Sequence, residues 1–169
     1  MIAYFDTSSL AKLYLSEEGS EYARDLSTSA SLRATSVIAY AEMRSVLARK
    51  RRTGELHGDE CREAVRDFEA DWSRLMHVAL SEELVSDAGD LADRHALRGM
   101  DAIHLASALW LRTQEGRDRI VFPTSDTALV RAAHKEGLST SMAEGFGGSS
   151  GGALPVRERG ARWRRSRKR

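Results

Sequence analysis

The stretch MIAYFDTSSLAKLYL, residues 1–15, joins a short apolar run to a segment with helical periodicity. Residues 2–5 are apolar and β-prone, whereas Leu10, Leu13 and Tyr14 fall on one face of a helix. The Asp, Thr and Ser residues between the two runs are types that cap a helix. This stretch therefore predicts a strand, a turn and a helix, in that order.

The same order recurs along the rest of the chain. Short apolar runs predict further strands near residues 33–35, 77–81 and 119–123 and an edge strand at 138–142. Helical periodicity predicts helices over residues 36–52, capped by Thr35 or Ser36, and over residues 59–75, 81–97, 100–114 and 127–137. Alternation of short strands with helices is typical of an α/β fold on a parallel sheet.

Length and composition bound the class of protein. With 169 residues, 41% hydrophobic and 30% charged, the chain has the size of one soluble domain. No apolar run reaches the roughly 18 residues of a membrane span, and no basic leader precedes the first strand, so we expect a cytoplasmic protein. Cys61 is the only cysteine, which excludes an intrachain disulfide.

Charge and amino-acid composition change near the C-terminus. The net charge is +1, but residues 157–169 carry eight basic side chains and one acidic side chain, so residues 1–156 sum to −6. A Gly/Ser-rich stretch precedes this basic end, and neither part can build a core. We predict a folded domain over residues 1–142, and a linker and Arg-rich tail over residues 143–169 that are disordered on their own.

Four acidic residues stand in settings that suit a metal site. Asp6 and Asp126 each follow a predicted strand, Asp101 begins a predicted helix, and Glu42 lies inside one. Ligands of open parallel sheets bind beyond the carboxyl ends of the strands, and oxygen ligands are those that Mg²⁺ and Mn²⁺ prefer. The simpler alternative for Asp6, Asp101 and Asp126 is an N-cap, and for Asp6 the residues Thr7, Ser8 and Ser9 could cap instead.

Glu42 discriminates best between these interpretations. It lies six positions after Ser36, too deep for a capping box, on a partly apolar helix face where an unpartnered carboxylate is costly. The alternatives are an exposed side chain beside Arg44 or Arg49, or a buried pair with an arginine. His104 is interpreted as a satisfied core histidine and not as a ligand.

Four segments together resemble a PIN-domain ribonuclease, and within that group the VapC toxins of bacterial toxin–antitoxin pairs. The segments are IAYFDTSSLAKLY, TSVIAYAEMRSVLAR, GMDAIHLASAL and FPTSDTALVRAA, in the order of the family and within about the first 142 residues. The resemblance implies a three-layer α/β/α sandwich with a central parallel sheet. It implies RNA cleavage that depends on Mg²⁺ or Mn²⁺ held by Asp6, Glu42, Asp101 and Asp126, with supporting hydroxyls at Thr7, Ser8 and Thr124.

The resemblance also implies a partner antitoxin, and we expect a homodimer or a toxin–antitoxin hetero-oligomer. RNA could be attracted by the basic run Arg49, Lys50, Arg51 and Arg52, which could equally be a solvated helix end. Trp163 in the basic tail could stack on a base, or the tail could be inert. Two alternatives to a nuclease are a non-catalytic RNA- or protein-binding module and a phosphatase with Asp6 as nucleophile; the latter usually has a second Asp where Ser8 stands.

Overall fold

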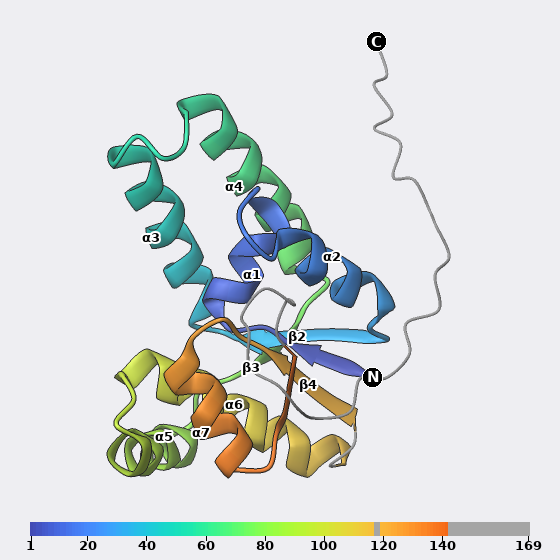
Figure 1. Ribbon diagram of the computed structural model, residues 1–169, viewed down its shortest axis with the longest axis vertical. Coiled ribbons are helices and arrows are strands. Elements are labelled where there is room, and N and C mark those ends of the chain that lie inside the picture. Colours follow the sequence, from blue (N-terminus) through green and yellow to red (C-terminus); the bar gives the residue numbers. More distant parts are fainter. Residues whose placement is uncertain (117–118, 142–169) are drawn as a thin grey trace.

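The computed structural model describes residues 1–116 and 119–141 and shows strands and helices alternating along the chain (Figure 1). The strands are β1 (Ile2–Tyr4), β2 (Leu32–Ser36), β3 (Met76–Val78), β4 (Ile120–Pro123) and β5 (Ser139–Ser141). The helices are α1 (Thr7–Tyr14), α2 (Ser20–Ser29), α3 (Ala39–Arg52), α4 (Gly58–Trp72), α5 (Glu82–His95), α6 (Gly99–Glu115) and α7 (Thr127–Lys135).

The sheet is parallel throughout and has the strand order β3-β2-β1-β4-β5. From the central β1 the chain moves outward through β2 and β3, and then returns to β4 on the other side of β1. The direction of winding therefore reverses between β1 and β4, where Ile2 pairs with Ile120. In open α/β sheets the crevice beyond such a reversal is the usual ligand site.

Successive side chains of β1 and the residue after it enter two separate cores. Ile2 and Tyr4 join one buried cluster with residues of α5, α6 and α7, whereas Ala3 and Phe5 join another with residues of α1, α3 and α4. This alternation is what a strand covered on both faces requires. The predicted three-layer α/β/α sandwich is confirmed, with α1 to α4 over one face and α5 to α7 over the other (Figure 1).

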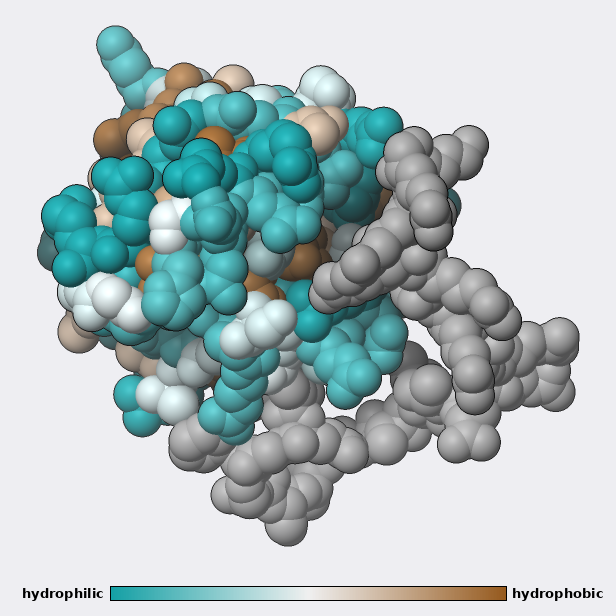
Figure 2. Space-filling view, turned by 90° about the horizontal axis from the view of Figure 1, so that it is seen from above, coloured by the Kyte–Doolittle hydropathy of each residue, from teal (hydrophilic) through white to brown (hydrophobic). Residues whose placement is uncertain are grey.

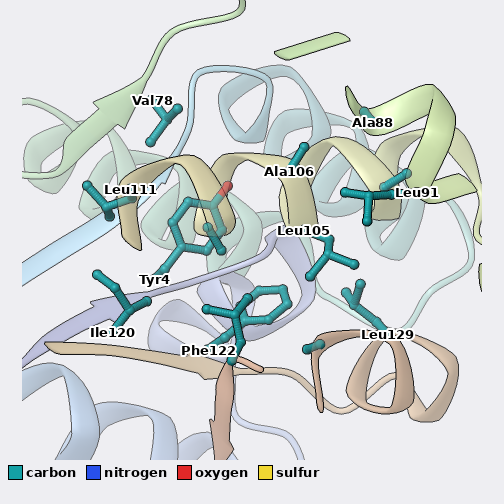
Figure 3. Packing of buried hydrophobic residues seen from close by; sticks show 14 of the residues in the cluster. Tyr4, Val78, Ala88, Leu91, Leu105, Ala106, Leu111, Ile120, Phe122 and Leu129 are labelled. Carbon is teal, nitrogen blue, oxygen red and sulfur yellow. The ribbon is translucent and has the colours of Figure 1, made fainter. Parts of the chain in front are cut away.

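The core beneath α6 is built around Tyr4 (Figure 3). Its ring meets Phe122 edge-on at 5.6 Å between ring centroids, and Leu105 and Leu111 of α6 are fully buried in the same cluster. Each such side chain contributes roughly 1.5–3 kcal/mol by its burial. This packing fixes α6, and with it Asp101 and His104, over the centre of the sheet.

Two sequence predictions about local structure differ from what the structure shows. Thr35 and Ser36 do not cap a helix: they are buried in β2, where the Thr35 hydroxyl donates to the carbonyl of Phe5 at 2.8 Å, and α3 begins only at Ala39. Helix α2 was not predicted. It buries little more than Ala23 and Leu26, too narrow an apolar stripe to stand out.

The remaining predictions concern the ends of elements and the surface. Helix α4 ends at Trp72 rather than at residue 75. Among the residues that the structure describes, no helix has the length and apolar character needed to cross a membrane. The face seen in Figure 2 is mainly hydrophilic, with apolar residues scattered across it. The predicted linker and tail, residues 143–169, lie outside the described residues, as does Met142.

Candidate active site

Asp6 follows β1 and caps α1 with one oxygen of its carboxylate. Its Oδ1 accepts the backbone N–H of Ser9 at 2.7 Å and the Ser8 hydroxyl at 3.0 Å, so the N-cap alternative is correct and Asp6 itself is the cap. Its Oδ2 accepts the hydroxyl of Thr124, which follows β4, at 2.8 Å. Asp6 is only 5% exposed, and these bonds hold its carboxylate between the ends of β1 and β4, where the direction of winding reverses.

Asp126 occupies the corresponding place after β4. It caps α7, because its Oδ1 accepts the backbone N–H groups of Ala128 and Leu129 at 2.8 and 2.9 Å. Its own N–H donates to the hydroxyl of Thr124 at 3.3 Å. Thr124 therefore lies between the two aspartates and hydrogen-bonds to both, which confirms that these strand ends meet.

Glu42 lies in the first turn of α3, and its side chain reaches toward α1 and α6. Its Oε2 accepts the hydroxyl of Thr7 at 2.5 Å and lies 2.9 Å from Nε2 of His104. The side chain is 25% exposed. Both simpler alternatives are wrong for this residue: its partner is a histidine rather than an arginine, and Arg44 pairs with Glu69 instead.

His104 is a buried core residue, as predicted, but it also positions Glu42. Its Nδ1 lies 3.1 Å from the Tyr4 hydroxyl, and its Nε2 faces Glu42 and, at 3.0 Å, Thr7. An ionised carboxylate can only accept, so Nε2 carries the proton toward Glu42 and the Tyr4 hydroxyl donates to Nδ1. The sequence contains no signal for this chain of contacts, because its members are up to 100 residues apart.

The surroundings of Glu42 favour its ionised form. Burial raises the pKa of this carboxyl, but the hydrogen bonds from His104 and Thr7 bring the pKa below its ordinary value. The carboxylate therefore remains charged at neutral pH although it is half-buried.

Asp101 lies in the first turn of α6 but does not cap it, since the N-cap is Arg98; the cap alternative is wrong here. The Nε of Arg98 is 3.6 Å from Asp101 Oδ2. Burial raises the pKa of Asp101, and the charges of Asp126 and Asp6 raise it further against the opposing charge of Arg98. Asp101 therefore lies within reach of the negative charge of Asp126 and Asp6.

The donor atoms are of the chemical type that a hydrated divalent cation uses. Within residues 1–116 and 119–141, no group of three or more His, Cys, Asp or Glu side chains is close enough to hold a metal ion by itself. However, Mg²⁺ keeps several water molecules and is usually bound through only one or two carboxylates. The carboxylates of Asp6, Glu42, Asp101 and Asp126, with the hydroxyls between them, provide the oxygen chemistry that Mg²⁺ and Mn²⁺ prefer.

Two other features lie away from these carboxylates. A hollow of about 380 Å³ is lined by Ser27, Arg33 and Arg74 among others, at the start of β2 and therefore at the opposite edge of the sheet. The basic run Arg49–Arg52 forms the last turn of α3, at the other end of the helix from Glu42, and Lys50 in it pairs with Glu17 and Glu55. Neither feature adjoins the four acidic residues.

Comparison with known proteins identifies the protein family to which this fold and its four acidic residues belong. The PIN domain model matches residues 3–135, a range that includes all four acidic residues. The chain belongs to the PIN domain family.

Two curated proteins of this kind are similar to the chain over most of its length. The chain is 37% identical over 143 residues to Ribonuclease VapC45 of Mycobacterium tuberculosis, an alignment that covers 85% of this chain and 96% of the relative. It is equally similar to Ribonuclease VapC49 of the same species.

Solved structures agree on the fold. FitAcB from Neisseria gonorrhoeae has a TM-score of 0.57 at 18% identity, over 83% of this chain and 96% of that one. VapBC2 from Rickettsia felis, bound to a DNA fragment from their promoter, has a TM-score of 0.56 at 14% identity, over 85% of this chain and all of that one.

Proposed function

We propose that this protein is an endoribonuclease that depends on Mg²⁺ or Mn²⁺ and serves as the toxin of a toxin–antitoxin pair. The observation that carries the proposal is the acidic edge of the sheet, where Thr124 links Asp6 to Asp126 and the charges of both raise the pKa of Asp101. The sequence identity to two ribonucleases supports RNA as the substrate.

The side chains divide into two roles. Asp6, Glu42, Asp101 and Asp126 would hold the cation, directly or through its water molecules. Its positive charge would offset the negative charge of the scissile phosphate and make a water molecule easier to deprotonate. Thr124 and Ser8 fix the Asp6 carboxylate, and Thr7 and His104 fix that of Glu42. Fixed carboxylates need little rearrangement when the reaction begins, which favours catalysis.

The proposal predicts that purified protein cleaves single-stranded RNA with Mg²⁺ or Mn²⁺ and not with EDTA. Asp101→Asn removes a charge with little disturbance of the fold, because Asp101 does not cap its helix. We expect it to lower the cleavage rate at least about 100-fold, the loss typical when a group at such a centre is removed. Fragment analysis on gels measures this rate.

Asp87→Asn is the matched control, since Asp87 is an exposed acid of α5 outside the site. It should cleave like the wild type. Undiminished cleavage in EDTA, or by Asp101→Asn, would contradict the proposal.

One alternative is a non-catalytic module that binds RNA or protein. It is favoured by the capping roles of Asp6 and Asp126, which occupy one oxygen of each carboxylate. The same gels separate the two functions, because a binding module retards RNA without producing fragments.

The proposed antitoxin partner is supported by the names of the similar structures, among them a toxin–antitoxin complex from Klebsiella pneumoniae with a TM-score of 0.52, 20% identity, and coverage of 74% of this chain and 87% of that one. Expression of this chain alone should arrest bacterial growth, and the Asp101→Asn variant should not. Light scattering of the purified chain, alone and with a co-expressed partner, would separate a homodimer from a hetero-oligomer. Growth unaffected by the active chain would argue against the toxin role.

A further inference from the structure

A basic hollow of about 230 Å³ lies between the end of α5 and one face of α7. Its polar lining comes from Arg94 and His95 of α5 and from Arg131 and Lys135 of α7, and three alanines form the rest. We call this feature the α5–α7 hollow. Three of its four polar residues carry a permanent positive charge, in a domain whose sequence up to residue 156 sums to −6.

Helix α7 presents two cations to this hollow along a single face. Ala128, Arg131, Ala132 and Lys135 follow the spacing of one helix face, and the rise from Arg131 to Lys135 is about 6 Å. Both cationic side chains are exposed, and neither pairs with a carboxylate among the other described residues. They are available to an anion from solution.

The α5 side of the hollow is held in place by Glu136. Its carboxylate accepts from Arg94 at 2.8 Å and lies 2.7 Å from Nε2 of His95, while Arg112 donates to its backbone carbonyl at 2.7 Å. These contacts hold Arg94 in place, and the negative charge of Glu136 offsets positive charge on the α5 side of the hollow. The unpaired positive charge of the hollow therefore belongs to Arg131 and Lys135.

The chain itself places the hollow beside the acidic site. Ala96 of its lining lies five residues before Asp101, and Ala128 lies two residues after Asp126. In the chain, Arg98 lies between Ala96 of the hollow and Asp101 of the site; its side chain is 86% exposed and its Nε is 3.6 Å from Asp101 Oδ2. Arg98 thus adds a positive charge beside Asp101, on the segment that joins the α5 end of the hollow to α6.

We propose that the α5–α7 hollow, with Arg98, binds phosphates of single-stranded RNA next to the cleaved bond. The inference deepens the proposed function and rests on it. A phosphodiester can accept charge-assisted hydrogen bonds from Arg131, Lys135 and Arg98, and such contacts position a strand without reading its sequence. The bound RNA strand then extends from the acidic site along α7, and not toward the distant basic end of α3.

The test compares two double variants that each remove two positive charges. Arg131→Gln with Lys135→Gln alters the hollow, and Arg49→Gln with Arg51→Gln alters the end of α3 as a matched control. Binding of a fluorescein-labelled oligoribonucleotide is followed by anisotropy at several salt concentrations, in the full chain carrying Asp101→Asn, with gels to confirm that the RNA stays intact. The basic tail is present in every variant, so its contribution cancels.

Each phosphate contact on a single strand adds roughly 0.7 to the slope of log Kd against log salt concentration. We expect the slope to fall by about 1.4 in the hollow variant, with Kd weakened about 10-fold or more at low salt. In the same variant with Asp101 intact, KM should rise while kcat stays within about twofold, since uniform binding is what is lost.

The outcomes separate this inference from the proposed function. Equal binding by the parent and the hollow variant, an equal loss in the α3 control, or no RNA binding by the parent would each overturn the inference. The hollow variant could bind RNA more weakly, as expected, while the wild-type chain never cleaves RNA. That result would support the hollow as an RNA-binding site and would refute only the proposed nuclease activity.

Discussion

At the scale of single residues, the position of Glu42 depends on residues from three other elements. Tyr4 of β1 holds His104 of α6, and His104 and Thr7 of α1 hold the carboxylate. These groups satisfy one another inside the fold, so a buried polar chain replaces what would be a costly unpartnered charge. A carboxylate held in this way has a defined direction and a pKa below its ordinary value.

Replacing Thr7 with valine removes one of the two hydrogen bonds to Glu42 and keeps the shape of the side chain. We expect the cleavage rate to fall about 10- to 100-fold and Mn²⁺ binding to weaken by a similar factor, as when the group that orients a ligand is lost. The pKa of Glu42 should rise, because a bond that lowers it is gone; carbon NMR of the carboxyl measures this. Thr7→Ser keeps the hydroxyl and should behave like the wild type. Wild-type activity and an unchanged Glu42 titration in Thr7→Val would contradict this role.

At the scale of elements, Glu136 at the end of α7 connects three helices of one layer. It accepts from Arg94 and faces His95, both of α5, and its carbonyl accepts from Arg112 of α6. The hydrogen bond from His95 lowers the pKa of Glu136 most, burial opposes it, and Arg94 lowers it further. The contact therefore stabilises the packing of α7, which carries both Asp126 and the α5–α7 hollow.

The stability that Glu136 supplies should depend on pH. Because its pKa is lower in the folded than in the unfolded chain, its contribution is complete above the unfolded pKa, about 4.5, and is lost as pH falls through the folded value. Glu136→Gln should lower the free energy of unfolding at pH 7 by about 1 kcal/mol, and the difference should shrink toward pH 3. Urea unfolding at several pH values measures this, with Asp87→Asn as control. A constant difference at all pH values would exclude the linkage.

At the scale of the whole molecule, the strand order makes the site possible. Asp6 and Thr124 are 118 residues apart, yet they hydrogen-bond because β4 returns to lie beside β1. The Ser9 hydroxyl, which donates to the carbonyl of Pro123 at 2.6 Å, joins α1 to the same strand end. The site is thus a property of the folded sheet and not of one segment.

A whole-molecule prediction concerns the boundary placed at residue 142. A chain that ends there should unfold within about 2 °C of the full chain, because both buried core clusters lie before that point. It should also retain metal-dependent cleavage of RNA. Calorimetry and the cleavage gels measure the two properties. A large loss of stability would show that the tail forms part of the folded unit.

The sequence alone determined the order of the strands, the order of every described helix except α2, and the acidic residues that follow strands. These follow from periodicity, capping and turn chemistry within a few neighbouring residues, as in residues 1–15. Helix α2 was not predicted from the sequence, because its apolar stripe is narrow. Only the tertiary structure decided that β1 and β4 are neighbours, that Glu42 meets His104, and that Arg131 and Lys135 of α7 line one hollow with Arg94 of α5. Such contacts arise from the packing of segments far apart in the chain, and no local pattern encodes which segments will meet.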